Sequence, residues 1–249
     1  MLGRRRRVGG VTAQHPEPDA GFEIRPLASV DDAFAASDVL ARVWGGDRGA
    51  MPPQLLRAMA HAGSYTVGLW DDGEMIGASV AFFGAPTDRT MHSHITGVLP
   101  GRQGRGIGRM LKQHQREWAL EREVGTITWT FDPLVRRNAH FNFRVLGVRA
   151  VEYLVNHYGA MDDGVNRGDE TDRILVAWSV ASAAAAMPED THVVASVEVP
   201  ADIETLRRTD PDAAREWRIR VREQMQAHIA AGRVVGGFDD TRGYLLVRS

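Results

Sequence analysis

The sequence predicts a mixed α/β layer fold, and three observations support this prediction. Short apolar stretches typical of strands are interspersed with longer segments whose apolar residues recur at helical spacing. Turn-forming residues separate them, most clearly the Asp-Asp-Gly-Glu of residues 71–74. The 249 residues are 43% hydrophobic and carry a net charge of −2, which is typical of a folded protein rather than a disordered one.

The elements of this fold can be placed in order along the chain. A strand is expected at residues 22–27, followed by a helix for which Ser29 is the expected N-cap. A second helix should begin at Pro52 and Pro53, because proline is tolerated in the first helical turn. The later elements are a strand hairpin at 64–84, a strand at 91–100, a glycine-rich loop and helix within 101–123, a strand at 126–131, a short helix at 136–147, and strands at 148–159 and 172–180. Together they predict a sheet flanked by helices.

The two ends of the chain differ from this core, which is assigned to residues 22–187. Residues 1–21 are rich in glycine, proline and charge and are expected to form a flexible tail. Residues 188–249 are expected to form an extension that packs on the core, with a strand, a short helix, a long helix beginning at Asp210–Pro211 and a closing hairpin. An apolar stripe on the long helix comprises Ala214, Trp217, Val221, Met225 and Ile229.

Composition excludes several classes of protein. The absence of cysteine rules out disulfides, thiolate zinc sites and a cysteine nucleophile. Thirty basic residues against 32 acidic ones argue against a dedicated nucleic-acid-binding protein. The tail has basic residues at Arg4 to Arg7 but no following apolar stretch, so we expect a cytoplasmic protein with no membrane association. A nucleic-acid role for these arginines is the least favoured alternative, and it predicts salt-sensitive binding that is lost with the tail.

The segment from Val98 to Leu111 carries the most specific motif. A strand ends there at a proline, and glycines at positions 101, 104, 106 and 108 lead the chain into a helix. Backbone amides of such a loop, together with the helix N-terminus, form an anion site. Arg102, Arg105 and Arg109 add positive charge, so a diphosphate is the expected ligand.

Comparison with known nucleotide-binding patterns narrows this interpretation. The dinucleotide fingerprint would need glycine at position 109, and no Gly-Lys pair of a P-loop occurs anywhere in the chain. The remaining pattern, Gln-x-x-Gly-x-Gly at Gln103, Gly106 and Gly108, resembles the acyl-CoA pyrophosphate loop of the GNAT superfamily of N-acyltransferases. The segments SHITGVLP, WTFDPL and RRNAHFN also resemble a little-characterised bacterial branch of that superfamily.

This resemblance implies a GNAT-like mixed central sheet flanked by helices, with acyl-CoA as co-substrate and no metal. It implies that the backbone of the fourth strand pairs with the pantetheine arm, at Thr96, Gly97, Val98 and Leu99. It places the diphosphate on the loop and helix start, at Gln103, Gly104, Arg105, Gly106, Ile107, Gly108 and Arg109. Asn138 and Phe141 would flank the pantetheine or the thioester.

The expected catalytic groups are less well defined. His94 is the candidate general base, since an imidazole titrates near neutrality, and His92 lies two residues away on the same face of a strand; structural hydrogen-bonded histidines are the alternative. Asp132 could bind an amine or orient His94, or could simply shape the turn before Pro133. Many GNAT enzymes have a tyrosine acid where this chain has Phe143, so Tyr153 is the expected substitute, with Tyr158 as a second candidate.

Four further charged residues are given structural interpretations. Asp172 and Arg173 are expected to form a local ion pair or a cap. Arg218 and Arg222 on the long helix are expected to face solvent or, less often, to reach an acceptor carboxylate.

These observations favour an enzyme that moves an acyl group, acetyl or longer such as succinyl, from CoA to the amine of a small molecule by direct attack in a ternary complex. A homodimer is compatible with the sequence. The main alternative is a CoA-binding regulatory or scaffold protein without turnover, which the phenylalanine at position 143 would suit.

Overall fold

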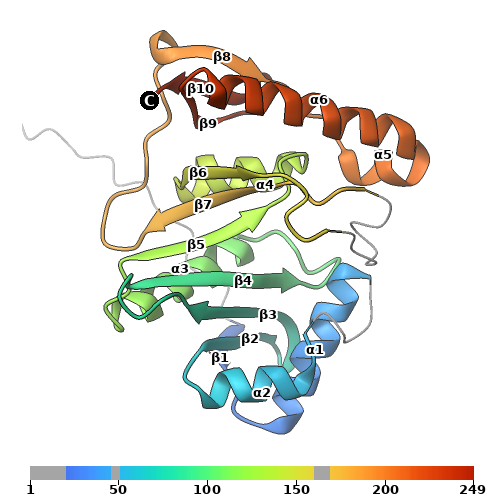
Figure 1. Cartoon of the computed structure of the whole chain (residues 1–249). Coiled ribbons are helices and arrows are strands. Elements are labelled where there is room, and N and C mark those ends of the chain that lie inside the picture. Colours follow the sequence, from blue (N-terminus) through green and yellow to red (C-terminus); the bar gives the residue numbers. More distant parts are fainter. Residues whose placement is uncertain (1–20, 46–50, 160–168) are drawn as a thin grey trace, which may run out of the picture.

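The computed structural model describes residues 21–45, 51–159 and 169–249, and it confirms the predicted mixed α/β fold (Figure 1). The predicted tail, including Arg4 to Arg7, lies outside the described residues except for Gly21. A seven-stranded sheet has the order β1-β2-β3-β4-β5-β7-β6. Its strands are β1 (Phe22–Pro26), β2 (Tyr65–Asp71), β3 (Glu74–Phe83), β4 (Thr90–Val98), β5 (Thr126–Phe131), β6 (Arg149–Leu154) and β7 (Arg173–Ser179). All neighbouring strands in it are antiparallel except β4 and β5, which are parallel.

Local sequence signals account for the first elements. Ser29 caps α1 (Val30–Trp44): its side chain accepts a hydrogen bond from the Asp32 amide, and the Asp32 carboxylate accepts one from the Ser29 amide. The predicted hairpin joins β2 to β3, and its central residues Asp72 and Gly73 both have positive φ. Two such residues in succession match the right-handed twist of paired strands, which explains why Asp-Gly forms the turn.

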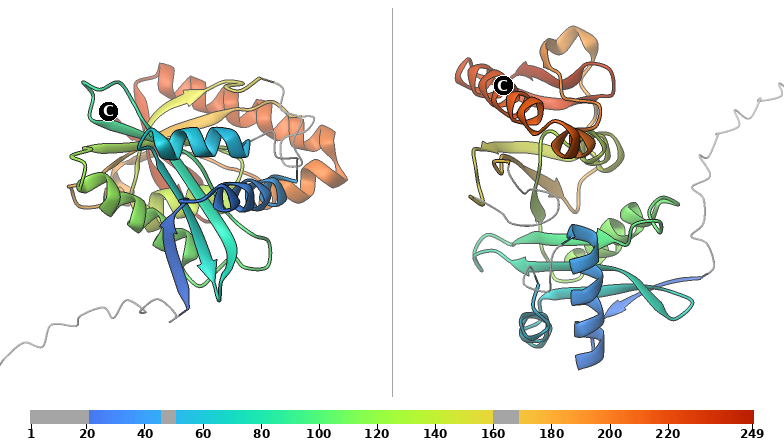
Figure 2. Two further views of the ribbon diagram at one scale, coloured as in Figure 1. Left: turned by 90° about the horizontal axis from the view of Figure 1, so that it is seen from below. Right: turned by 90° about the vertical axis from the view of Figure 1, so that its right-hand side faces the viewer.

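Helices cover both faces of the sheet. α1 and α2 (Pro53–His61) pack on one face through a cluster that includes Leu40, Leu56, Val80 and Leu99. α3 (Ile107–Leu120) packs on the opposite face, where Leu111 meets Leu69 and Ile76. In Figure 1 α1 and α2 lie in front of the strands and α3 behind them, and the right panel of Figure 2 shows the same arrangement from the side.

The last quarter of the chain forms a second layer beside β6. A three-stranded antiparallel sheet of order β8-β10-β9 is covered by the helices of this region (Figure 1). The elements are the short helix η3 (Asp190–His192), β8 (Val193–Val197), α5 (Ile203–Thr209), α6 (Pro211–Ala230), β9 (Arg233–Asp239) and β10 (Gly243–Arg248). The predicted stripe is buried at Ala214, Val221 and Met225, whereas Ile229 is exposed.

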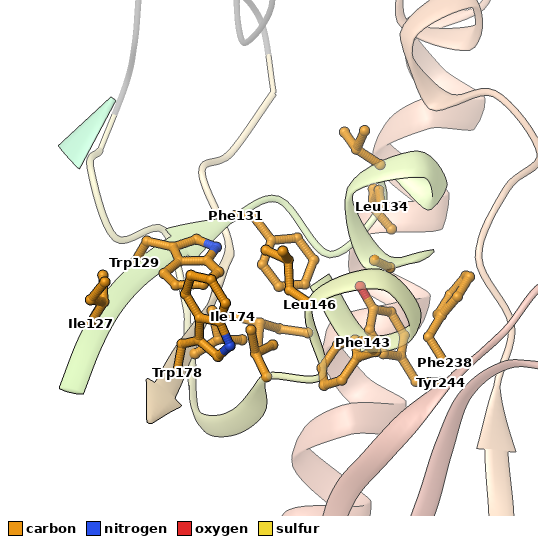
Figure 3. Packing of buried hydrophobic residues seen from close by; sticks show 14 of the residues in the cluster. Ile127, Trp129, Phe131, Leu134, Phe143, Leu146, Ile174, Trp178, Phe238 and Tyr244 are labelled. Carbon is orange, nitrogen blue, oxygen red and sulfur yellow. The ribbon is translucent and has the colours of Figure 1, made fainter. Parts of the chain in front are cut away.

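One apolar core runs through both layers. α4 (Arg136–His140) continues into a π-helical turn, η2 (Phe141–Leu146), that lies between them. In this turn the Phe143 ring packs edge-on against Phe131 of β5 and Tyr244 of β10, with centroids 6.3 and 6.0 Å apart (Figure 3). Because residues from both layers share this buried cluster, we propose that 188–249 is an extension built onto the 22–187 core.

Candidate active site

The sheet parts between β4 and β5. These strands pair only from Thr90 to His92, opposite Thr126 to Thr128, and they separate toward their carboxyl ends (Figure 1). A bulge in β4 follows at once: Val80 of β3 pairs with Ile95 and Ala81 with Ser93, so His94 is the extra residue. The parting therefore begins where a bulge re-aims the side chains of β4.

Beyond the bulge, one edge of β4 pairs with no strand among the residues that the structure describes. The Leu99 amide donates to the Ile76 carbonyl on β3, 2.8 Å away. Because backbone groups of alternate residues point to opposite sides of a strand, those of Thr96 and Val98 point toward the parting, where β5 has turned away. Gly97 is required by packing, since a Cβ there would lie 2.6 Å from the ring of Trp44 on α1.

The glycine-rich loop ends at this edge and opens α3. Gly101, Gly104 and Gly106 have positive φ, as does Arg105 between them, and Gly106 is the N-cap residue of the helix. No side chain caps this end of α3. The first amides of a helix have no partner within it, and the helix dipole makes this end positive. The loop thus presents backbone amides and a positive helix end to the opening, which is the geometry that the predicted anion site requires; the site itself stays a prediction.

The three arginines of the loop differ in their partners. Arg102 donates to Asp71 and Glu74 at 3.0 and 2.9 Å, and Arg105 lies 3.8 Å from Asp71. Arg109, on the exposed face of the first turn, forms no ion pair within the described part of the chain. It is therefore the arginine best placed to meet an incoming anion.

Other predicted cofactor residues lie around the same opening. The Gln103 side-chain amide donates to the Val98 carbonyl at 3.3 Å, so it fastens the loop to the end of β4. A Cβ on Gly108 would lie 3.6 Å from the ring of Phe141, which places the start of α3 beside η2. Asn138, on α4, is half-buried one turn before Phe141. β4, the loop and η2 thus bring the predicted residues together from three parts of the chain.

Histidines and hydroxyl groups lie on the sheet face opposite α3. His92 and His94 both stack on Phe82, with ring centroids 5.4 and 5.8 Å apart. His92 Nδ1 lies 3.2 Å from Thr128 Oγ1, and the hydroxyls of Thr130 and Tyr158 are 3.0 Å apart. Burial lowers the pKa of both histidines below the ordinary value, although the His94 ring is accessible to solvent. Both are therefore neutral at pH 7 and able to accept a proton.

Asp132 does not serve the catalytic role considered for it, but it does shape the turn at Pro133, because its carboxylate accepts a hydrogen bond of 2.9 Å from the Leu134 amide. Arg218 grips its carboxylate with two hydrogen bonds of 2.9 and 2.8 Å, and Arg207 donates a third of 2.6 Å. Burial alone would raise the pKa of Asp132, but the arginines, Arg218 above all, hold that pKa well below its ordinary value. Asp132 is thus an anchor for the extension rather than a group free to bind an amine or to orient His94. Correspondingly, Arg218 does not face solvent: it is 1% exposed.

Two of the aromatic positions considered for the thiolate acid, 153 and 143, are committed elsewhere. The Tyr153 hydroxyl donates to Asp172 at 2.7 Å, and burial together with this carboxylate raises the pKa of the phenol. Asp172 is paired with Arg222 rather than with Arg173, which corrects the expected local pair. Phe143 is a core residue, 3% exposed. These positions provide no acid at the parting.

Sequence analysis missed the buried polar side chains of α3. Lys112 and Gln115 are 7% and 0% exposed and face β4, with Ser93 beside them. Their spacing was the available signal, because 111, 112, 115 and 119 lie on one face of a helix and two of those positions are apolar.

No group of three or more metal-ligating side chains occurs within the described ranges. Nor is any helix there long and apolar enough to cross a membrane.

A central sheet that parts between two parallel strands, with a glycine-rich helix start at the opening, is the arrangement expected from the resemblance to GNAT enzymes. Residues 34–147, slightly less than half of the chain, match the model of the acetyltransferase (GNAT) family. Over these residues the chain therefore matches the GNAT family, and the resemblance seen in its sequence is confirmed.

Solved structures show the same fold at low sequence identity. One is the ribosomal-protein-S18-alanine N-acetyltransferase of Escherichia coli, with 19% identity, a TM-score of 0.52, and coverage of 65% of this chain and 96% of that one. A putative GNAT acetyltransferase from Desulfovibrio desulfuricans has 21% identity, a TM-score of 0.53, and coverage of 64% and 99%. An aminoglycoside 6′-acetyltransferase of type Ii has 18% identity, a TM-score of 0.52, and coverage of 65% and 98%. No curated protein sequence matches the chain.

Proposed function

We propose that this protein transfers an acyl group from a CoA thioester to the amine of a small molecule. The observation that carries the proposal is the unpaired edge of β4 beyond His92, which runs directly into the glycine-rich start of α3. Backbone groups of Thr96 and Val98 would pair with the amides of the pantetheine arm. The amides of the loop, with Arg109, would bind the diphosphate.

The reaction would be a direct attack in a ternary complex. The amine nitrogen bonds to the thioester carbon, the carbon–sulfur bond breaks, and the sulfur leaves as thiolate. A thiol has an ordinary pKa near 8.5, so this leaving group does not require an acid, which fits the core role of Phe143. We propose His94 as the base that accepts the ammonium proton, because it is neutral and lies at the bulge where the strands part.

The acceptor is proposed to be a small molecule rather than a protein side chain. Side chains of α5 and α6 bind Asp132 at the carboxyl end of β5, so the extension lies beside the opening between β4 and β5. An opening bounded in this way suits a compact acceptor. The donor is proposed to be acetyl-CoA or a longer acyl-CoA such as succinyl-CoA.

A second candidate function is CoA binding without turnover. It is favoured by the engagement of Asp132 and Tyr153 in ion-pair and hydrogen-bond networks and by the burial of Phe143. Turnover separates the two candidates: release of free thiol from acetyl-CoA or succinyl-CoA, followed with a panel of small amines, is expected for the enzyme and absent for the binding protein.

The binding step can be tested by thermal unfolding with CoA, acetyl-CoA and succinyl-CoA, using NAD and ATP as controls. We expect a saturable rise in Tm with the CoA compounds alone. Gly106→Glu should abolish this rise, because it places a carboxylate and a side chain at positive φ in the anion site. Gly63→Glu is the matched control: Gly63 also has positive φ and open space around it, but it lies in the turn after α2. Equal responses of both variants to CoA would contradict the assigned loop.

A further inference from the structure

The only lysine of the chain is buried on the inner face of α3. Lys112 Nζ donates to Ser93 Oγ at 2.9 Å and to Gln115 Oε1 at 3.2 Å, and it lies 3.8 Å from the centre of the Trp129 ring. Burial lowers the pKa of this amine to about 7. An ammonium removed from water is costly unless an anion accompanies it.

Two groups in this cluster, the Lys112 amine and the Gln115 side-chain amide, lack a negatively charged acceptor in the part of the chain that the structure describes. Among the described residues, no carboxylate pairs with Lys112: its hydrogen-bond partners are a hydroxyl, an amide oxygen and an aromatic face. Gln115 is fully buried, and its Nε2 has no acceptor in the same part of the chain. A buried cation without an anion and a buried N–H without an acceptor would both be satisfied by one negatively charged oxygen group.

The cluster lies at the closed end of the parting between β4 and β5. His92 and Thr128 form the last backbone pair of the two strands. Ser93 and Trp129 are the next residues on each strand, and both turn their side chains to Lys112. The amine therefore lies next to the point where β4 and β5 separate. It is on the face of the sheet that α3 covers, and the histidines are on the opposite face.

We propose that Lys112 and Gln115 form a subsite for a carboxylate at the far end of the acyl group, so that the preferred donor is a dicarboxylic acyl-CoA. This inference rests on the proposed function, since it requires the acyl chain to enter between β4 and β5. An acetyl group has no carboxylate to place there, and a neutral chain of the same length as succinyl would leave both donors without a charged acceptor. The Trp129 ring lies over the amine and contributes to its burial.

The test compares the binding of CoA, acetyl-CoA, butyryl-CoA and succinyl-CoA by calorimetry. Butyryl and succinyl chains have the same number of carbons, so their difference reports the carboxylate alone. Wild-type protein should bind succinyl-CoA at least about tenfold more tightly than butyryl-CoA, as expected for hydrogen bonds to charged groups. Lys112→Met should remove this preference and leave the affinity for free CoA unchanged.

A pair of variants on the same helix provides the matched control. Gln115→Met should weaken succinyl-CoA selectively, whereas Gln113→Met, on the exposed face of α3, should not. Methionine has a similar linear side chain and carries no charge that must be kept from water, so Lys112→Met is expected to fold. A variant that does not fold leaves the wild-type comparison in force: equal wild-type affinities for the succinyl and butyryl thioesters would overturn the inference.

Other outcomes separate this inference from the proposed function. If Lys112→Met weakens CoA, butyryl-CoA and succinyl-CoA equally, Lys112 is a structural residue and only the subsite is wrong. If none of the four compounds binds to folded wild-type protein, the proposed function fails and the subsite fails with it.

A single lysine also allows a direct spectroscopic readout. In protein labelled with ¹³C-lysine, the one Cε signal reports the titration of Lys112. His92 on β4 is its titratable neighbour, while β5 contributes Trp129 and α3 contributes Gln115. Succinyl-CoA should raise the pKa of Lys112 by at least one unit, because a carboxylate favours the ammonium form. Acetyl-CoA should not, and equal shifts with both ligands would contradict a carboxylate contact.

Discussion

At the scale of single residues, the proposed reaction requires a neutral histidine at the bulge of β4. Because burial lowers the pKa of His94, the imidazole stays unprotonated down to a pH below its ordinary value of about 6.5. Below that lowered pKa, activity should therefore fall by up to tenfold per pH unit, because His94 becomes protonated. Protonation of the acceptor amine adds its own effect to this decrease. His94→Asn should reduce kcat/KM by about 10²–10⁴-fold and remove this acidic limb. His61→Asn, at the exposed end of α2, is the control, and an unchanged pH profile in His94→Asn would exclude His94 as the base.

The second prediction at this scale concerns Phe143, where the family resemblance leads us to expect a tyrosine. Its ring is enclosed by Phe131 and Tyr244, so a hydroxyl added there would be buried among aromatic groups. Phe143→Tyr should lower the free energy of unfolding by about 1–3 kcal/mol without raising kcat. Phe83→Tyr, on an exposed ring, should change stability by less than about 0.5 kcal/mol. Faster turnover in Phe143→Tyr would show that the ring does reach the leaving thiol.

At the scale of elements, the strands, the helices and the glycine-rich loop follow from local signals. The turn at Asp72 and Gly73, the cap at Ser29 and the glycines before α3 each require a particular backbone conformation, and sequence reports such requirements directly. Contacts between elements that are far apart in the sequence have no comparable local signal. Asp132 before Pro133 is compatible with a simple turn, and only the packing of α6 onto β5 identifies Arg218, 86 residues later, as its partner.

The parting of β4 and β5 illustrates the same distinction. The glycine loop could be predicted as an anion site because it is one continuous segment. The polar cluster beneath the parting joins one residue of β4, two of α3 and one of β5, and none of these segments is unusual alone. Lys112 was visible in the sequence only as an oddity of composition. Its significance is that a buried amine has hydroxyl, amide and aromatic neighbours where an anion would be expected.

At the scale of the whole molecule, ion pairs join the extension to the end of the central sheet. Arg207 and Arg218 each contact both Asp132 and Asp169, and all four side chains are at most 8% exposed. Arg222 adds a further link to Asp172. These pairs fix α5 and α6 against the carboxyl end of β5 and the amino end of β7, beside the proposed acceptor side. Ion pairs thus hold the extension next to the proposed site, and apolar packing around Phe143 and Tyr244 holds it farther from the site.

Removing one arginine from this network should destabilise the whole protein. Arg218→Ala leaves Asp132 and Asp169 buried without their main partner, which should lower the free energy of unfolding by about 3–5 kcal/mol. Arg215→Ala, which breaks an exposed pair with Asp212 one turn away, should cost less than about 1 kcal/mol. Both values can be measured by urea unfolding at pH 7.

The dependence on pH provides an independent check of the same network. Because the pKa of Asp132 is lower in the folded protein than in the unfolded chain, its contribution to stability is complete above the unfolded value of about 3.9 and is lost as the pH falls toward the folded one. Wild-type protein should therefore lose stability steeply below pH 4, and Arg218→Ala less steeply, because the mutation raises the folded pKa of Asp132 toward its ordinary value. Parallel acid unfolding profiles for the two proteins would show that Arg218 does not hold the charge of Asp132.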